Sequence, residues 1–190
     1  YKYLNGGPGS PGFIHVRRDH HTSLTQPIAG WFGHRDMFGF SPAFEPDESI
    51  RRFMVGTPPI LAMAATGAGI AITAEAGMDA VCAKATLLTD FFIEAIAPLI
   101  DAGQIELITP RDPLQRGSHV AVRHDDGYRL SVALRAASVI VDFRAPDIIR
   151  FGFAPLYTTY SEVAASVACL EELLVSGAYT TGPTQRHGVT

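Results

Sequence analysis

The sequence of 190 residues predicts an α/β fold: a small two-layer domain, with helices on one face of a mixed sheet, preceded by a long segment of loops. From residue 57 onward, stretches with helical apolar spacing alternate with short apolar runs typical of strands. The first sixty residues differ, because they hold seven of the thirteen prolines and half of the aromatic side chains. A hydrophobic content of 47% with 18% charged residues favours a globular protein with a buried core.

The loop-rich segment comes first and contains one short strand candidate, Gly12–Val16. A helix should follow, with Thr57 at its N-cap and Pro58 at its first position, running to about Ala76. Pro98 should bend or end the second helix. In chain order, we predict a helix over 79–101, strands over 105–109 and 119–124, a helix over 128–137, strands over 139–143 and 148–153, a helix over 161–176, and a mobile tail over 179–190.

Composition excludes several classes of protein. A formal net charge of -4 offers no basic field, so we expect no nucleic-acid partner. The uncharged stretch 53–74 is interrupted by prolines and glycines and is rich in Ala and Thr, which favours a buried helix over a membrane span. Cys82 and Cys169 match no metal spacing and are predicted to be buried free thiols in a reducing compartment, hence in a cytoplasmic protein.

Lys2 is unusual because the chain has only one other lysine, Lys84. Lys2 lies between two tyrosines and is followed by a glycine-rich loop. Desolvation by aromatic rings favours a neutral, nucleophilic amine, and glycines allow a backbone to approach a bulky ligand. Lys2 is therefore a candidate Schiff-base lysine, although a solvated lysine is the commoner fate of this residue type.

Three further residues are candidates for binding anions. Trp31 carries an indole N–H suited to a phosphate or carboxylate oxygen, although on its own this residue is better interpreted as a core tryptophan. The hydroxyl of Thr57 would lie where a helix dipole favours an anion. Arg150 lies inside an apolar strand and needs a carboxylate partner, which is either a substrate or a salt bridge to Asp142 or Asp147.

A glycine-containing run and a group of early histidines are weaker patterns in the sequence. The run Gly67–Ile72 lacks the third glycine of a dinucleotide fingerprint and lies within a helix, so contact between helices through small residues is the better interpretation. Four early histidines, with Asp19 and Asp36 nearby, show no spacing typical of metal ligands, and we predict no metal site.

Six segments together carry a family resemblance: Tyr1–Gly6, Gly30–His34, Thr57–Leu61, Thr109–Arg111, Arg116–Gly117 and Arg150–Tyr157. In this order and spacing they strongly resemble kynureninase, over nearly the whole chain to about Val175. The resemblance implies the type I aminotransferase-like fold of pyridoxal-phosphate enzymes. Residues 1–58 would then be the last part of the cofactor-binding large domain, and residues 59–178 the small α/β domain with its connecting helix.

The resemblance also implies a function: hydrolysis of L-kynurenine or 3-hydroxykynurenine to anthranilate or 3-hydroxyanthranilate and L-alanine, in tryptophan catabolism and NAD biosynthesis. Lys2 matches the lysine that holds pyridoxal 5'-phosphate and then shuttles protons. Tyr1 matches a phosphate contact, and Trp31 and Thr57 match phosphate contacts supplied across the interface of a homodimer. Arg150 matches the arginine that binds the substrate carboxylate.

The chain departs from the family pattern in two respects. Ser138 stands where glycine is usual and Val141 where a small residue is usual, which affects helix-end packing rather than chemistry. The family's amino-terminal half is absent, so we expect the isolated chain to be inactive and the natural polypeptide to be roughly twice as long. Two alternatives stay open: another type I pyridoxal-phosphate enzyme, such as a desulfurase or aminotransferase, or a non-catalytic binding or dimerisation module.

Overall fold

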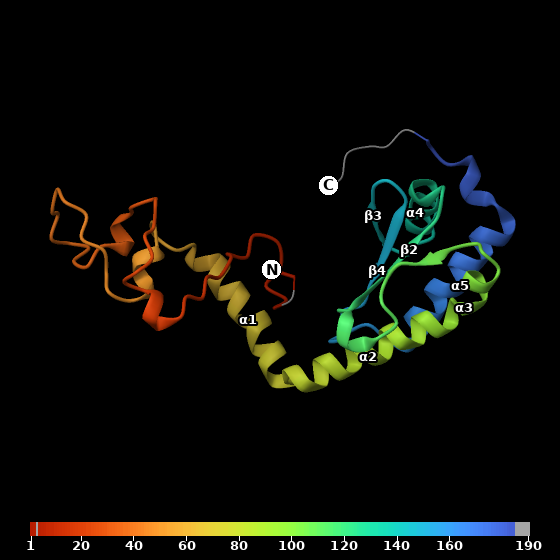
Figure 1. The fold of residues 1–190 in the computed structure, drawn as a ribbon, viewed down its shortest axis with the longest axis horizontal. Helices are drawn as coiled ribbons and strands as arrows, with labels where there is room; N and C mark the ends of the chain where they lie inside the picture. The colour runs from red at the N-terminus through yellow and green to blue at the C-terminus, as the bar shows by residue number, and fades with distance from the viewer. Residues whose placement is uncertain (3, 185–190) are drawn as a thin grey trace. The chain divides into compact units, whose positions relative to one another are not determined.

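The computed structural model describes residues 1–2 and 4–184 (Figure 1). Within it the chain divides into two compact units, Tyr1–Glu75 and Ala76–Thr190. The first unit consists of loops with three 3-10 helices, η1 (Arg18–His20), η2 (Trp31–Gly33) and η3 (Ile50–Phe53), followed by helix α1 (Ile60–Ala76). The strand predicted over Gly12–Val16 is wrong, because no described segment lies beside it to complete a hydrogen-bonded ladder.

Helix α1 begins later than predicted. The carbonyl of Pro59 accepts the first helical hydrogen bond, from the Met63 amide at 2.9 Å, so Pro59 is the N-cap and Thr57 lies two residues before it. The predicted capping role of Thr57 is therefore wrong. Since a residue that precedes a proline avoids the helical conformation, Pro58 is held extended by Pro59, and the helix starts only after the pair.

The second unit combines helices with one sheet. Its elements are α2 (Met78–Ala95), α3 (Ala97–Asp101), β1 (Glu106–Leu107), η4 (Pro113–Gln115), β2 (His119–Arg123), α4 (Gly127–Ala136), β3 (Asp142–Arg144), β4 (Ile148–Gly152), α5 (Tyr160–Ser176) and η5 (Ala178–Thr181). The predicted effect of Pro98 is confirmed, because the helix breaks at Ile96 and Pro98 falls in the first turn of α3.

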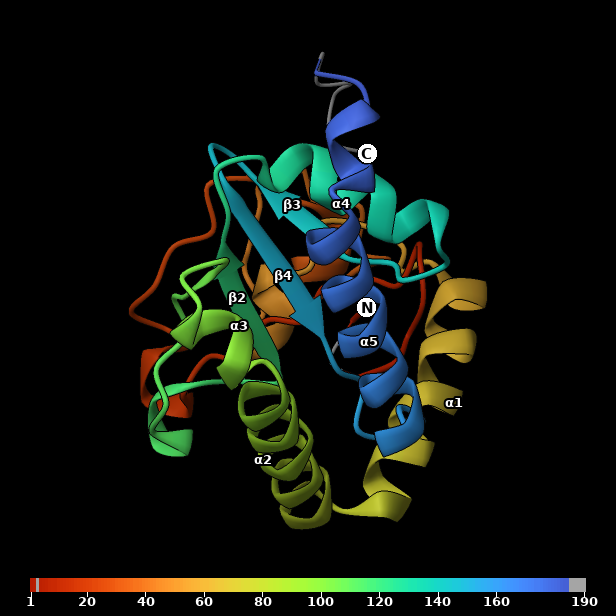
Figure 2. The same ribbon diagram turned by 90° about the vertical axis from the view of Figure 1, so that its right-hand side faces the viewer.

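The sheet has the order β1-β2-β4-β3, and every neighbouring pair is antiparallel. The prediction of a mixed sheet is therefore wrong. A turn of only three residues joins β3 to β4, which makes these two strands antiparallel neighbours, and β4 then lies between β2 and β3. Figures 1 and 2 show α2, α4 and α5 on the same side of this sheet.

The core of the second unit lies between the sheet and these helices. Alternate strand residues point inward, and they pack with helix residues in one buried cluster that includes Leu88, Phe92, Val120, Val122, Leu130, Leu134, Ile149, Phe151, Val163 and Leu170. The intervening residues belong to the opposite face. Ala121 and Asp142 are both register partners of Arg150, so these three side chains project from that opposite face.

The structure also bears on the predictions for the uncharged stretch 53–74 and for the two cysteines. No single helix of the described part is long and apolar enough to cross a membrane, and α1 and α2 satisfy length and composition only when combined across the break at Gly77. Both cysteines are free, but Cys82 is exposed, so its predicted burial is wrong; partial burial raises the pKa of the Cys169 thiol.

The predicted mobile tail is in part an ordered element. Residues 178–181 form η5, and Arg129 holds this turn by donating to the carbonyls of Thr180 and Gly182. Residues 185–190 lie outside the described part of the chain.

Candidate functional site

The amino-terminal loop is anchored along helix α1. The side-chain amide of Asn5 donates from Nδ2 to the Thr73 hydroxyl at 3.2 Å, and the Thr66 hydroxyl donates to the Ser10 hydroxyl at 2.8 Å. Gly69 lies between the two threonines on the same buried helix face, where an added Cβ would be 2.2 Å from the Asn5 carbonyl oxygen. The small residues of α1 therefore receive a loop within the first unit, and the predicted contact with another helix is wrong.

This loop presents Lys2. The Lys2 carbonyl accepts a hydrogen bond from the Asn5 amide at 3.2 Å, and the Tyr1 carbonyl accepts one from the Gly7 amide at 3.2 Å. The Lys2 ammonium lies 5.4 Å from the centroid of the Tyr1 ring and makes no ion pair with a described carboxylate. Lys2 is exposed and Tyr1 is 60% exposed, so the predicted desolvation by the Tyr1 ring is not present, while Tyr3 lies outside the described residues. The loop thus holds the lysine by its backbone and leaves its amine free.

Trp31 and Thr57 lie on adjacent chain segments. The turn that carries Trp31 packs directly on residues 52–55, since a Cβ at Gly30 would be 1.7 Å from the Val55 carbonyl oxygen and one at Gly33 would be 2.7 Å from that of Met54. Only glycine permits this approach. The Trp31 indole N–H and the Thr57 hydroxyl donate to no described residue, and both side chains are exposed. Each of the two donors is therefore available to a ligand.

A hollow of about 580 Å³ lies beside Trp31 and is lined by His34, Phe40 and Phe44 among others. Edge-on contacts with Phe32 and Phe38, at centroid distances of 4.5 and 6.1 Å, fix the indole ring at the margin of this hollow.

Helix α1 separates Lys2 from the Trp31 and Thr57 pair. The Lys2 loop contacts α1 from Thr66 to Thr73, whereas Thr57 comes before the first residue, Ile60. At 1.5 Å per residue, Thr66 and Thr73 are about 9 and 20 Å from Ile60 along the helix axis. The Lys2 loop therefore packs along the helix beyond its start, where Thr57 lies.

Three of the four early histidines, His20, His21 and His34, are engaged in local contacts. The His21 ring binds the Val16 carbonyl at 2.8 Å, and Arg17 bridges Asp19 and His20. In His34, Nδ1 accepts from the Asp36 amide at 3.0 Å. No group of three or more His, Cys, Asp or Glu side chains able to hold a metal ion is found in the described part of the chain.

Arg150 projects from the open face of the sheet with a carboxylate beside it. Its Nε donates to Asp142 Oδ2 at 2.8 Å, and its Nη2 donates to the same oxygen. The Arg144 Nη2 lies 3.1 Å from that oxygen too. Of the two salt-bridge partners considered from the sequence, Asp142 is the one observed, while Asp147 pairs with Arg123 at 3.3 Å. The Arg150 Nη1 donates to no described residue, so the guanidinium keeps donors for a second carboxylate.

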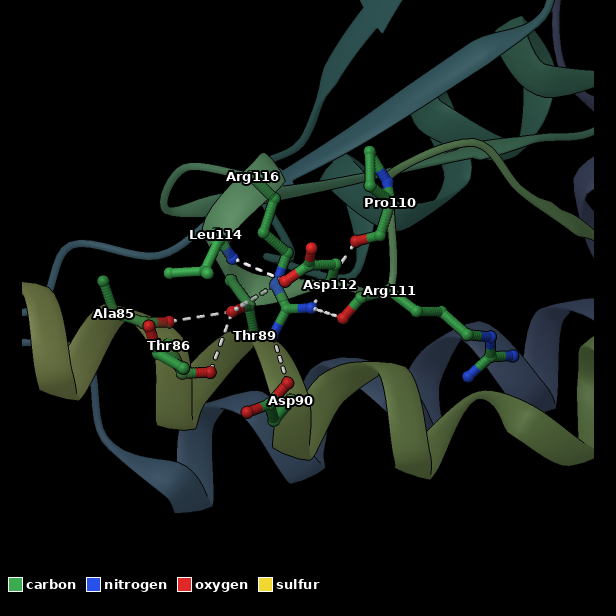
Figure 3. A network of polar contacts seen from close by, with 9 residues as sticks. All are labelled: Ala85, Thr86, Thr89, Asp90, Pro110, Arg111, Asp112, Leu114 and Arg116. Carbon is green, nitrogen blue, oxygen red and sulfur yellow. Dashed lines mark hydrogen bonds and ion pairs between the residues drawn. The ribbon is translucent and has the colours of Figure 1, made fainter.

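Sequence reasoning did not identify Arg116 as a structural centre. Its side chain is 2% exposed and donates to the Thr89 hydroxyl at 3.1 Å, to Asp90, and to the Arg111 carbonyl (Figure 3). These contacts fix the loop over 110–116 onto α2. The only sequence signal was the place of Arg116 in a segment of the family resemblance.

Comparison with known proteins agrees with the resemblance. Residues 81–170 match the model of the kynureninase C-terminal domain. The chain is 44% identical to a kynureninase of Burkholderia mallei (strain SAVP1) over 179 residues, which are 94% of the chain and 43% of the relative. It is 42% identical to a kynureninase of Pseudomonas fluorescens over 100% of the chain and 46% of that relative, so the expected end of the similarity at about Val175 is wrong.

Solved structures show the same fold. The chain superposes on an apo cysteine desulfurase from Thermococcus onnurineus NA1 with a TM-score of 0.72 at 19% identity, over 85% of the chain and 42% of that structure. A C-DES variant with glycine covalently linked to its PLP cofactor gives a TM-score of 0.67 at 17% identity, over 85% and 42%. The architecture is thus that of the type I fold of pyridoxal-phosphate enzymes.

The chain spans less than half the length of the curated relatives that it matches. The sequence match and the fold nevertheless agree over almost all of it. By sequence, the chain is similar to the carboxy-terminal half of kynureninases.

Proposed function

We propose that the protein to which this chain belongs hydrolyses L-kynurenine or 3-hydroxykynurenine to anthranilate or 3-hydroxyanthranilate and L-alanine, with pyridoxal 5'-phosphate as its cofactor. The identity of 42% and 44% to curated kynureninases, over nearly the whole chain, carries the proposal. The likeness to cysteine desulfurases, at 19% identity or below, supports the fold and does not favour their reaction.

The residues present fit this cofactor. The cofactor needs a primary amine for its aldehyde carbon and hydrogen-bond donors for its phosphate. Lys2 supplies an amine that no described carboxylate occupies, on a loop whose backbone is fixed to α1. The Tyr1 hydroxyl, the Trp31 indole N–H and the Thr57 hydroxyl donate to no described residue, so all three are available for phosphate oxygens.

When bound, pyridoxal phosphate supplies an electron sink that stabilises negative charge developing on the carbon atoms of the amino acid. In our proposal, Lys2 Nζ first holds the cofactor and, once substrate displaces it, removes the proton from the substrate α-carbon. The same amine returns a proton when the alanine fragment is completed. Because the Lys2 loop is bonded to α1 at two points, the backbone that carries this amine is held in one place.

Arg150 binds the substrate α-carboxylate in this proposal. Its Nη1 and the second hydrogen of Nη2 point away from the edge that Asp142 occupies, which leaves two parallel donors for a carboxylate. Binding at this point selects amino acids over the corresponding amines. The half-exposed position of Arg150 on the open sheet face allows a substrate to reach it.

We propose a homodimer with a shared site. In line with the family resemblance, Trp31 and Thr57 of one copy would complete the phosphate site of another copy, because the Lys2 loop packs along α1 beyond its start. We also propose the assignment of residues 1–58 to the large domain and of 59–178 to the small domain. Cytoplasmic location, the role in tryptophan catabolism, and inactivity of the isolated chain stay predictions.

The experiment is to incubate the intact protein, loaded with pyridoxal phosphate, with L-kynurenine and to follow anthranilate by its fluorescence. Anthranilate and L-alanine in equal amounts are the expected result. Turnover of L-cysteine or transamination without anthranilate would replace the proposal by another enzyme of the same fold. Lack of turnover and of cofactor binding in the intact protein would favour a non-catalytic module.

A further inference from the structure

We propose that Asp142 is a positioning residue that orients the Arg150 guanidinium for the substrate carboxylate. The inference rests on the proposed function, in which Arg150 binds that carboxylate. Asp142 and Arg150 are register partners on the antiparallel strands β3 and β4, so their side chains project from the same, open face of the sheet. Asp142 Oδ2 accepts from both Nε, at 2.8 Å, and Nη2 of Arg150.

This arrangement fixes a flexible side chain in one orientation. An arginine presents two edges that suit a carboxylate, the Nε–Nη2 edge and the Nη1–Nη2 edge. Asp142 takes the first edge and thereby aims the second edge away from β3. Asp142 is therefore not a competitor of the substrate, because a carboxylate that binds the Nη1–Nη2 edge leaves the Asp142 contact in place.

Arg144 completes the charge balance. Its Nη2 lies 3.1 Å from the same Oδ2 of Asp142, and it is the register partner of Ile148 on the same face as Arg150. Two guanidinium groups thus share one carboxylate, and the trio keeps one positive charge on the open face. That residual charge matches the single negative charge of an amino-acid carboxylate.

A purely structural role does not explain the pair as well. The side chains of Arg150 and Asp142 are 34% and 40% exposed, and ion pairs at such exposure contribute little to stability. The strands are already held by ladder hydrogen bonds and by the buried residues Ile149 and Phe151 on the other face. Orientation of a ligand-binding arginine is the use that this geometry serves.

The test compares Asp142→Asn with the unchanged intact protein, loaded with cofactor, using two ligands of matched size. L-alanine carries the carboxylate, and L-alaninamide lacks it. We expect the dissociation constant of L-alanine to rise about tenfold, the effect of weakening one charge-assisted contact, while that of L-alaninamide stays unchanged. The KM for L-kynurenine should rise with little change in kcat, and Asp142→Glu should recover most of the affinity.

Glu106→Gln is the matched control, since Glu106 pairs with Arg123 at 2.5 Å and belongs to the same sheet. It should leave both dissociation constants unchanged. Three results for Asp142→Asn would each overturn the inference. The first is an equal loss of affinity for L-alanine and L-alaninamide, and the second is a lowered unfolding midpoint with no selective loss of affinity for L-alanine. The third is no effect on either affinity.

Failure of the proposed function gives a different result. If the unchanged protein makes no anthranilate but binds L-alanine in preference to L-alaninamide, and Asp142→Asn removes that preference, the role of Asp142 stands without kynurenine hydrolysis. If the unchanged protein shows no preference for the carboxylate, the inference is overturned.

Discussion

Replacing Gly69 by alanine tests whether the loop that carries Lys2 depends on its contact with α1. The added Cβ would be 2.2 Å from the Asn5 carbonyl oxygen and 2.8 Å from that of Leu4, while ordinary contacts begin at 3.4 Å. The loop backbone would therefore have to retreat by about 1 Å, and overpacking of this kind costs about 1–3 kcal/mol. Both close atoms are backbone, so no side-chain rotation relieves the overlap.

Gly67→Ala is the matched control. Gly67 lies in the same helix, and a Cβ there would meet nothing within 4 Å. Both substitutions gain the same helix propensity, about 1 kcal/mol, which cancels in the comparison. The difference in the free energy of unfolding between the two variants should therefore equal the steric cost, about 1–3 kcal/mol, with Gly69→Ala the less stable.

Urea unfolding of the intact protein, followed by circular dichroism, measures this difference. Affinity for pyridoxal phosphate gives a second result, because displacement of the loop moves Lys2. Gly69→Ala should bind the cofactor more weakly, and Gly67→Ala should bind it as the unchanged protein does. Equal stability and equal cofactor affinity of the two variants would refute the anchoring of the Lys2 loop on α1.

Three other predictions concern the second unit, each measured by urea unfolding. Arg116→Met should lower the free energy of unfolding by about 3 kcal/mol, which is the low end for breaking a buried ion pair because Asp90 is 43% exposed. The control is Arg111→Met, which should have little effect because the Arg111 side chain points away from the network in Figure 3. Equal losses of stability in the two variants would contradict this role of Arg116. Ser138→Gly should stabilise the protein by about 1 kcal/mol, since Ser138 has φ +67°, a left-handed conformation that strains any residue except glycine. Ala137→Gly should give no gain, because Ala137 has φ -85°. A gain in stability in both variants would contradict backbone strain at Ser138. Burial lowers the pKa of His124, against the raising influence of Asp126 and Asp125. The stabilising contribution of neutral His124 is therefore present above its unfolded pKa of about 6.5 and is lost as the pH falls through the folded pKa. Between pH 7.5 and 5.5, His124→Gln should lose less stability than the unchanged protein, and identical losses would exclude His124 as the cause.

The sequence predicted the helices of the second unit well where their ends carry local signals. Helix α5 was expected over 161–176 and is found over Tyr160–Ser176, because Thr159 and Glu162 form a capping box and Gly177 adopts a left-handed conformation. Strand β3 was expected over 139–143 and is found over Asp142–Arg144. Since Ser138 takes a left-handed conformation and the Val139 amide still bonds the helix carbonyl of Leu134, the chain joins the sheet later than its apolar pattern suggests.

For the candidate site, residue chemistry indicated the ligand-binding groups but not their arrangement. An arginine in an apolar strand indicated a carboxylate partner, yet the choice between Asp142 and Asp147 depended on the register of β3 with β4. The scarcity of lysine singled out Lys2. The packing of its loop on α1 depended on contacts between residues far apart in the sequence, such as Asn5 with Thr73, which no local pattern contains.

The most direct test of the account is to identify which amine holds pyridoxal phosphate. The intact protein, loaded with the cofactor, is reduced with borohydride and digested, and the modified peptide is identified by mass spectrometry. We predict that the pyridoxyl group is on Lys2 and that Lys84, the other lysine of the chain, is unmodified. Modification of Lys84, or of no residue in this chain, would contradict the assignment of Lys2 as the Schiff-base lysine.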